Sequence, residues 1–359
     1  MNKSCLIGFL MCSAFSLVVQ AATDGAHITK TISQIERKKG IKRTIQYRPD
    51  GNDFVCVNGK NRYTRALYGG ITDFRIETSD RPVFAAYKPK DSKHICFRLQ
   101  CGNQSIALDS LKFCEARYRA GRRTYRLTDP LLGKGELNIS VLAFPDAEGG
   151  IWRFTMKDMP EGALLHCYIS EIRAKNLSRN GDMGADRADS FDAPQLPKEQ
   201  KHYKLSLDGT TAYIVVEDQE LRLPALVEGT SLYDKSEKWR SEIESSLQIS
   251  TPDPYFNPLG GALAAAADGI WDGKIWLHGA IGWRSQLNGW RAAYIGDFIG
   301  WHDRARTHFD SYAASQVTDV PATIPHPTQD TALHLARSVK KWGTPHYSNG
   351  YISVSYTHL

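Results

Sequence analysis

The sequence predicts a protein of two parts, an antiparallel β-sandwich followed by α-helices. The first observation is a series of short alternating or apolar runs between residues 52 and 232, separated by turn residues. The second is a change of hydrophobic period after Ser236, where a charged segment precedes an alanine-rich one. Strands gathered in one half of a chain and helices in the other are typical of separate domains.

The runs expected to form strands alternate between inward and outward residues or are short and apolar. About a dozen at this spacing favour a large antiparallel sandwich. A further lead-in strand is expected near Arg43–Tyr47. The expected strands are Phe54–Val57, Phe74–Glu77, Val83–Tyr87, His94–Leu99, Ser105–Leu108, Phe113–Tyr118, Arg122–Leu127, Glu136–Phe144, Ile151–Met156, Ala163–Ser170, Tyr203–Leu207 and Thr211–Glu217.

In the second part, the sequence predicts a helical linker over residues 236–250 and then three helices. These are expected at Leu259–Trp271, Trp301–Gln316 and Thr328–Trp342. If the second helix begins near Asp297, then Asp297, Trp301, Arg304 and His308 share one narrow face. If it begins at Gly300 instead, Asp297 belongs to the preceding loop.

Composition and the N-terminus predict an exported protein. The 359 residues are 42% hydrophobic, and the net charge of +6 is scattered, so no nucleic-acid partner is expected. Lys3 precedes an apolar run that is too short for a comfortable transmembrane helix, and a small-residue cleavage site follows at Ala21. We expect a periplasmic or extracellular location. Met11 before Cys12 disfavours a lipoprotein, because a small residue is usual there.

The cysteines indicate neither a metal site nor a disulfide framework. Export would leave five, an odd number, namely Cys56, Cys96, Cys101, Cys114 and Cys167. No second pair of cysteines or histidines completes a ligand set, so the favoured interpretation is buried cysteines acting as small hydrophobes. Neither a metal nor a cofactor is expected.

A long polar segment, Asn176–Glu199, interrupts the strand pattern. Loops of this length are often functional, and we expect it to reach over a neighbouring domain. Its aspartates could suggest calcium, but their spacing does not match an EF-hand loop.

The stretch of residues 268–304 carries the strongest functional signal. Five of the eight tryptophans lie in it, among arginines, histidines, aspartates and glycines. Aromatic faces stack on sugar rings, and the polar groups can bond hydroxyls, which indicates a carbohydrate site. A tryptophan-rich packing core with buried Asp–Arg pairs is the alternative. The candidate substrate-binding residues are Trp276, His278, Trp283, Arg284, Trp290, Arg291, Trp301, His302 and Arg304.

Asp297 is the candidate catalytic carboxylate, because Trp301 and Arg304 are expected beside it. A neighbouring arginine would lower its pKa and favour a base or a hydrogen-bond acceptor. The alternative interpretation is structural: Asp297 and Arg304 would form an ion pair that joins two helices. Asp268 and Asp272 flank the end of the first helix and are expected to serve in turns.

Three segments resemble a secreted bacterial family of unknown function from polysaccharide-utilisation settings. They are Asn58–Tyr87, Asn180–Phe191 and Trp276–Phe309. The family is similar to the six-hairpin glycosidases, which carry a β-sandwich before an (α/α)6 barrel. The resemblance implies a glycoside hydrolase that acts on a complex polysaccharide or oligosaccharide. A carbohydrate-binding or scaffold protein without catalysis and a polysaccharide lyase, with Tyr294 and Arg291 at its site, stay open.

The domain boundaries expected from this resemblance leave the barrel incomplete. Twelve helices need well over about 250 residues, and only about 110 follow Ser250. We therefore expect a fragment whose second carboxylate lies beyond its end. The expected divisions are a signal peptide at 1–21, a β-sandwich at 22–235, the linker at 236–250, a partial (α/α)6 domain at 251–352 and an artefactual tail at 353–359.

Overall fold

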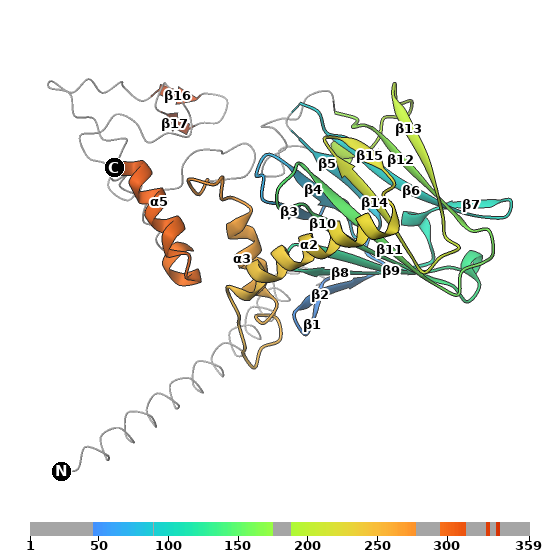
Figure 1. Cartoon of the computed structure of the whole chain (residues 1–359), viewed down its shortest axis with the longest axis horizontal. Helices are drawn as coiled ribbons and strands as arrows, with labels where there is room; N and C mark the ends of the chain where they lie inside the picture. The colour runs from blue at the N-terminus through green and yellow to red at the C-terminus, as the bar shows by residue number, and fades with distance from the viewer. Residues whose placement is uncertain are drawn as a thin grey trace, which may run out of the picture.

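The fold is that of a computed structural model of the chain, which describes residues 46–88, 90–174, 188–277, 295–313, 328–330 and 335–337. Two antiparallel sheets form a sandwich, and helices follow them in the chain (Figure 1). The predicted order, strands first and helices second, is confirmed.

The larger sheet has eight strands in the order β1-β2-β8-β9-β10-β11-β14-β15. Sequential strands pair as hairpins from β8 to β11, so this half of the sheet is an antiparallel meander. Its strands are β1 (Arg48–Asp50), β2 (Asp53–Val57), β8 (Phe113–Arg119), β9 (Arg122–Thr128), β10 (Glu136–Ala143), β11 (Gly149–Lys157), β14 (Thr211–Glu217) and β15 (Glu220–Arg222).

The smaller sheet has seven strands in the order β13-β12-β6-β5-β4-β3, and β7 pairs with β6. Its strands are β3 (Arg65–Tyr68), β4 (Arg75–Thr78), β5 (Val83–Tyr87), β6 (Lys93–Cys101), β7 (Gln104–Ala107), β12 (Leu164–Glu171) and β13 (Gln200–Ser206). Short 3-10 helices lie at η1 (Leu108–Ser110), η2 (Pro130–Leu132) and η4 (Ala188–Phe191).

All twelve expected runs lie in strands, with ends that shift by a few residues. The alternation of buried and exposed residues produced this agreement, because one face of each sheet packs on the core. The pattern missed β3 and β15, which have only four and three residues. The lead-in strand begins at Arg48, after the expected Arg43–Tyr47, of which only residues 46 and 47 are described.

The core lies between the two sheets and is rich in aromatic residues. Phe84 from the smaller sheet meets Trp152 from the larger one edge to face, with ring centroids 5.6 Å apart. Phe97 and Phe154 pack across the sheets in the same way, at 5.5 Å. Such aromatic pairs add about 0.5–1.5 kcal/mol each beyond the area they bury. They fix how the sheets stack.

Helix α2 (Leu226–Ser245) crosses the outer face of the larger sheet over β10, β11 and β14 (Figure 1). Its buried residues are Gly229, Tyr233, Ser236 and Arg240, which recur at one face of a helix. The predicted linker at 236–250 therefore captures only the second half of a longer helix. The first half falls within the range expected for the sandwich, and packing on the sheet stabilises it as helix.

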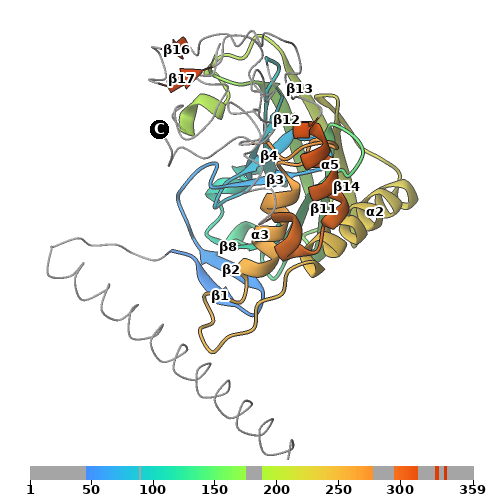
Figure 2. The same ribbon diagram turned by 90° about the vertical axis from the view of Figure 1, so that its left-hand side faces the viewer.

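Two further helices lie at one end of the sandwich, where Figure 2 shows them together. They are α3 (Leu259–Asp268) and α5 (His302–Ala313), close to two of the expected ranges. The end of α3 approaches the smaller sheet closely, because a Cβ on Gly269 would lie 2.6 Å from the ring of Tyr68. The described helices do not define an (α/α)6 barrel.

Gly300 has a φ of 83° and separates a helical turn at residues 295–299 from α5. A positive φ is a conformation that glycine adopts at little cost and that ends a helix. Asp297 therefore precedes α5, as expected if the helix began after Gly300.

The third expected helix, Thr328–Trp342, is wrong where the structure describes it. Residues Thr328–Asp330 (β16) and Leu335–Arg337 (β17) form a small antiparallel ladder. The prediction rested on local spacing after Pro327, and local spacing alone rarely sustains a helix without a packed apolar face.

No helix in the described part of the chain is long and apolar enough to cross a membrane. The five described cysteines carry no disulfide; Cys56, Cys114 and Cys167 are buried, and Cys96 and Cys101 are half-buried.

Candidate functional site

Asp268, the last residue of α3, is the most deeply buried carboxylate of the helical part that the structure describes. Its side chain is 7% exposed and accepts a hydrogen bond of 2.7 Å from Nη1 of Arg304 on α5. Burial raises the pKa of Asp268, and the opposing charge of Arg304 lowers it less. A buried carboxyl paired with a single arginine thus joins the two helices.

The guanidinium of Arg304 lies between two indole rings. Its central carbon is 4.4 Å from the ring centroid of Trp301 and 5.5 Å from that of Trp271. Cation–π contacts of this kind hold the planar group in one orientation. Trp301 is itself held, because its Nε1 donates to Ser246 at 3.3 Å. Two tryptophans, an arginine and an aspartate therefore meet at one place, which we call the Asp268 cluster.

The chain between Asp268 and Leu277 forms a tight turn that carries Trp271. Trp271 and Trp276 are bridge partners, and their rings are 4.8 Å apart. Asp272 closes the turn by accepting from the backbone N–H groups of Lys274 and Ile275. The expected turn role of Asp272 is confirmed. Asp268 differs, because its side chain points to Arg304 and only its backbone carbonyl serves the turn.

Trp276 is a core residue in this structure. It has no exposed surface, and its backbone N–H donates to Nδ1 of His308, which is also fully buried. A Cβ on Gly296 would lie 3.3 Å from the indole of Trp276, so the packing is close. The helix face predicted from Trp301, Arg304 and His308 does point inward. Of the candidate platforms, Trp276 cannot be reached by a ligand.

Asp297 and His302 lie in solvent, 70% and 68% exposed, and their side chains are 3.3 Å apart. Arg304 pairs with Asp268 rather than with Asp297, because the break at Gly300 interrupts the helical face that was expected to align them. The other candidates, His278, Trp283, Arg284, Trp290 and Arg291, lie outside the described residues, as does Tyr294.

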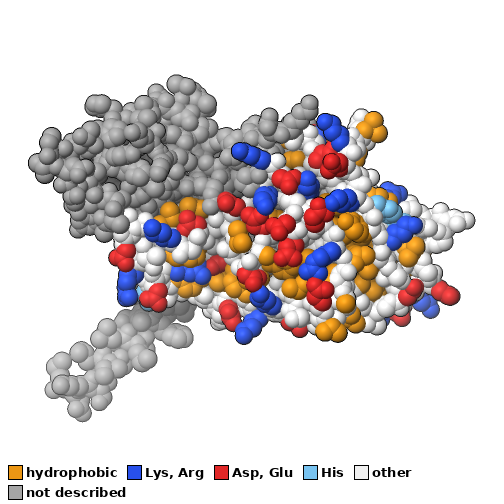
Figure 3. All heavy atoms as spheres, turned by 45° about the horizontal axis from the view of Figure 1, so that its top comes forward, with side chains coloured by type: hydrophobic (Ala, Val, Ile, Leu, Met, Phe, Trp, Pro, Cys, Tyr) orange, Lys and Arg blue, Asp and Glu red, His pale blue; other side chains and the backbone are white. Residues whose placement is uncertain are grey.

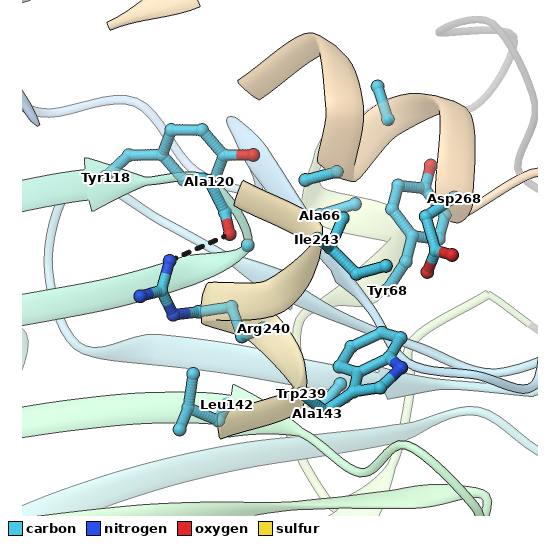
Figure 4. Close-up of a pocket in the computed structure, with 13 residues that line it drawn as sticks. Ala66, Tyr68, Tyr118, Ala120, Leu142, Ala143, Trp239, Arg240, Ile243 and Asp268 are labelled. Atoms are coloured by element: carbon cyan, nitrogen blue, oxygen red, sulfur yellow. Dashed lines mark hydrogen bonds between the residues drawn. The ribbon is translucent and has the colours of Figure 1, made fainter. Parts of the chain in front are cut away.

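Figure 4 shows a narrow cavity between the sandwich, α2 and α3, with Asp268 and Tyr68 at one end. At its other end Arg240 donates to the backbone carbonyl of Ala120. Its volume of about 50 Å³ accommodates water and no sugar ring. A ligand would therefore reach Asp268 from the side of Trp271, Trp301 and Arg304, which are only half-buried.

The end of the long polar segment is fastened to the smaller sheet. Asp192 accepts from Arg62 and from the hydroxyl of Tyr63, at 2.5 and 2.9 Å. Asp189 pairs with Arg173. Asp182 and Asp186 lie outside the described residues. The prediction that the loop reaches over a neighbouring domain depends on the same part of the chain and stays a prediction. Where the chain is described, no three His, Cys, Asp or Glu side chains gather as a metal would need.

Sequence reasoning and the geometry favour the same stretch of the chain but different aspartates. Asp268 follows an alanine run, so it looked like a helix end in need of a turn residue. The missed signal is its position on the last turn of α3, where the side chain of Asp268 is almost entirely buried. Only the pairing of α3 with α5, a tertiary fact, gives it a partner.

Comparison with known proteins finds a family model that matches part of the chain. Residues 89–216 match the model of a domain of unknown function, DUF4450. This range runs from β6 into β14 and so covers the middle of the sandwich. No curated protein matches the sequence at a significant level.

Proposed function

We propose that the protein is a glycoside-hydrolase-like protein that acts on a complex polysaccharide or oligosaccharide through the Asp268 cluster. The observation that carries the proposal is a buried carboxyl group held by an arginine that two indole rings flank. Hydrogen-bonding side chains beside aromatic rings are typical of sugar sites. The resemblance of Trp276–Phe309 to a secreted bacterial family, whose architecture is similar to that of the six-hairpin glycosidases, supports the same class.

Asp268 is suited to the role of general acid. Glycosidic cleavage needs a carboxyl group that donates a proton to the leaving oxygen, and a raised pKa keeps that proton available. Burial raises the pKa of Asp268 despite the adjacent Arg304. The sequence argument predicts a lowered pKa for Asp297, since it considers only the effect of a neighbouring arginine.

Arg304 is suited to binding hydroxyl groups. Its Nη1 is committed to Asp268, and its remaining N–H groups make no hydrogen bond within the described residues. The two indole rings fix the direction of those donors before a ligand arrives, which reduces the entropy lost on binding. Asp297 stays the catalytic carboxylate predicted from the sequence and is tested separately.

Export supports the choice of polysaccharides as substrates. The apolar run after Lys3 and the cleavage site at Ala21 predict secretion, and large glycans are met outside the cytoplasm. Fractionation of cells that express the full chain checks this step: recovery of the protein without residues 1–21 in the periplasm or medium is expected.

The experiment is a panel of plant and host polysaccharides, with product release and binding both measured. New reducing ends without an unsaturated product support a hydrolase. A rise in ultraviolet absorbance from an unsaturated product shows a lyase, and binding without any product shows a carbohydrate-binding protein. If no glycan on the panel is bound and none gives a product, the proposal is refuted. Asp297→Asn is assayed beside the wild type, and an unchanged rate removes Asp297 from the site.

A further inference from the structure

A second polar surface lies on the outer face of the larger sheet, beside α2. Two cross-strand rows of polar side chains face outward there, while their neighbours along each strand are buried in the core. The rows are Glu115–Arg126–Asn138–Thr155 and Arg117–Thr124–Ser140–Arg153. These residues, with Arg122 and with Tyr233 of α2, line an open groove of about 350 Å³. We call it the sheet groove.

Three of its arginines are already paired with carboxylates. Arg117 donates to Glu115 and Asp50, and Arg126 pairs with Glu115 and Glu136. Arg122 pairs with Glu237 of α2 at 2.8 Å. These pairs neutralise the positive charge and hold the guanidinium groups in place. The three arginines face four carboxylates, so none of their positive charge is left over, and with Thr124, Asn138 and Thr155 they present directed hydrogen-bonding groups.

Arg153 is different because it has no carboxylate partner. Its guanidinium stacks on the ring of Tyr233, with its central carbon 3.8 Å from the ring centroid. Its Nε is buried without an acceptor, and within the described residues its terminal nitrogens make no hydrogen bond or ion pair. Arg153 thus lines the groove with a guanidinium that is stacked on a ring and has no carboxylate within ion-pair distance in the described structure. Oxyanions that offer two oxygens side by side are the ligands that a guanidinium bonds best.

The stacking on Tyr233 could by itself explain Arg153 as an anchor for α2. The rest of the groove argues for more than an anchor. An anchor does not require two polar rows across four strands, and Tyr233 has a further bond to Ser140 at 2.7 Å that already secures the helix. The volume of the groove falls in the range of ligand sites, whereas the cavity at Asp268 is far smaller.

We propose that the sheet groove is a separate binding site for an acidic glycan, in which Arg153 bonds an oxyanion of the sugar. The choice of a glycan rests on the proposed function; the choice of an oxyanion rests on Arg153 alone. The oxyanion is the carboxylate of a uronate or a sulfate ester, since both offer oxygens to a guanidinium fork. The hydroxyl groups of the same sugar would meet Thr124, Asn138 and Thr155.

The test measures binding of three matched oligosaccharide series to the full chain by calorimetry: neutral, uronate-containing and sulfated. We expect the wild type to bind one acidic series at least about tenfold more tightly than the neutral one, as charge-assisted bonds allow. Arg153→Met should abolish this preference, and Arg153→Lys should restore part of it. Which acidic series is preferred distinguishes a carboxylate from a sulfate.

Arg98→Met is the matched control. Arg98 lies on the smaller sheet, bonds only Ser105 in the described structure and, like Arg153, has no carboxylate partner there. This control should bind as the wild type does. Thermal unfolding of Arg153→Met, compared with Tyr233→Phe, reports whether α2 stays docked.

Equal affinity for all three series, or an acidic preference that survives Arg153→Met, would overturn the proposal. Product release is recorded on the same samples. Loss of acidic-glycan binding with turnover intact would show that the two sites are separate. Turnover absent from every variant, with the acidic preference present, would refute the hydrolase and leave this site standing.

Discussion

At the scale of single residues, Trp276 is part of the hydrophobic core and does not offer its ring to a sugar. It is fully buried beside Ala305 and His308, whereas Trp271 is half-buried beside Arg304. The two tryptophans look alike in the sequence, since both lie in the same polar, glycine-rich stretch. Their difference depends on which ring the approach of α5 covers, and the spacing of residues does not encode that.

Replacing Trp276 with alanine should therefore destabilise the fold. We expect a loss of about 3–5 kcal/mol in the free energy of unfolding, because a large buried ring leaves a cavity. Trp271→Ala should cost less stability but weaken glycan binding. Chemical denaturation measures the first effect and calorimetry the second. An equally stable Trp276→Ala protein would mean that the ring is not packed as described.

Asp268 and Arg304 show what the sequence could establish about the site. The residue types, the stretch and the inward face of Arg304 and His308 were predictable from composition and period. The identity of the carboxylate was not, because the partner of Arg304 lies on another helix. A one-residue break at Gly300 was enough to move Asp297 away from the expected face.

At the scale of helices and strands, ion pairs hold helix α2 against the sandwich. Arg119 of β8 and Arg240 both donate to Glu244, at 2.6 and 2.7 Å. Burial tends to raise the pKa of Glu244, but the bonds from these two arginines hold it below its usual range. The pairs join the end of α2 to the β8–β9 hairpin, close to where the Asp268 cluster is built.

Glu244→Gln should reduce stability by about 1 kcal/mol at neutral pH, since partly exposed ion pairs give no more than this. The pKa of Glu244 is lower in the folded chain than in the unfolded one. Its stabilising contribution is therefore full above its ordinary pKa and is lost as the pH falls through the lowered value. The difference between wild type and variant should vanish in acid.

Denaturation curves at a series of pH values measure this difference. Glu242→Gln, an exposed carboxylate on the same helix, is the control and should show no such pH dependence. A gap between wild type and Glu244→Gln that stayed constant down to acidic pH would contradict a role for the ion pairs.

For the whole molecule, the sandwich was far more predictable than the helical part. Alternation along a strand such as Arg122–Thr128 directly reflects one buried and one exposed face. The helices depend on partners distant in the chain, as α2 does on β10, β11 and β14. Short ladders such as that of β16 with β17 contain too few residues for a hydrophobic alternation to be recognised in the sequence.

Charges of both signs are dispersed on the surface at the scale of the molecule, as far as one face shows (Figure 3). Figure 3 shows acidic and basic side chains intermixed on the face in view. The surface therefore offers local sites rather than one long-range field. The Asp268 cluster and the sheet groove are the two proposed sites, one with a buried carboxyl group and one with an arginine that has no carboxylate partner in the described structure.

The most direct test of the central claim is the initial rate of reducing-end release by Asp268→Asn on the best glycan from the panel. Asp303→Asn, whose carboxylate is 98% exposed on the neighbouring helix, is the control. We expect the Asp268 variant to lose at least about a hundredfold, within the range of lost general acid catalysis, with its fold and the control unaffected. The wild-type rate should fall as the pH rises through the raised pKa of Asp268. A rate for Asp268→Asn equal to that of the wild type would contradict the account.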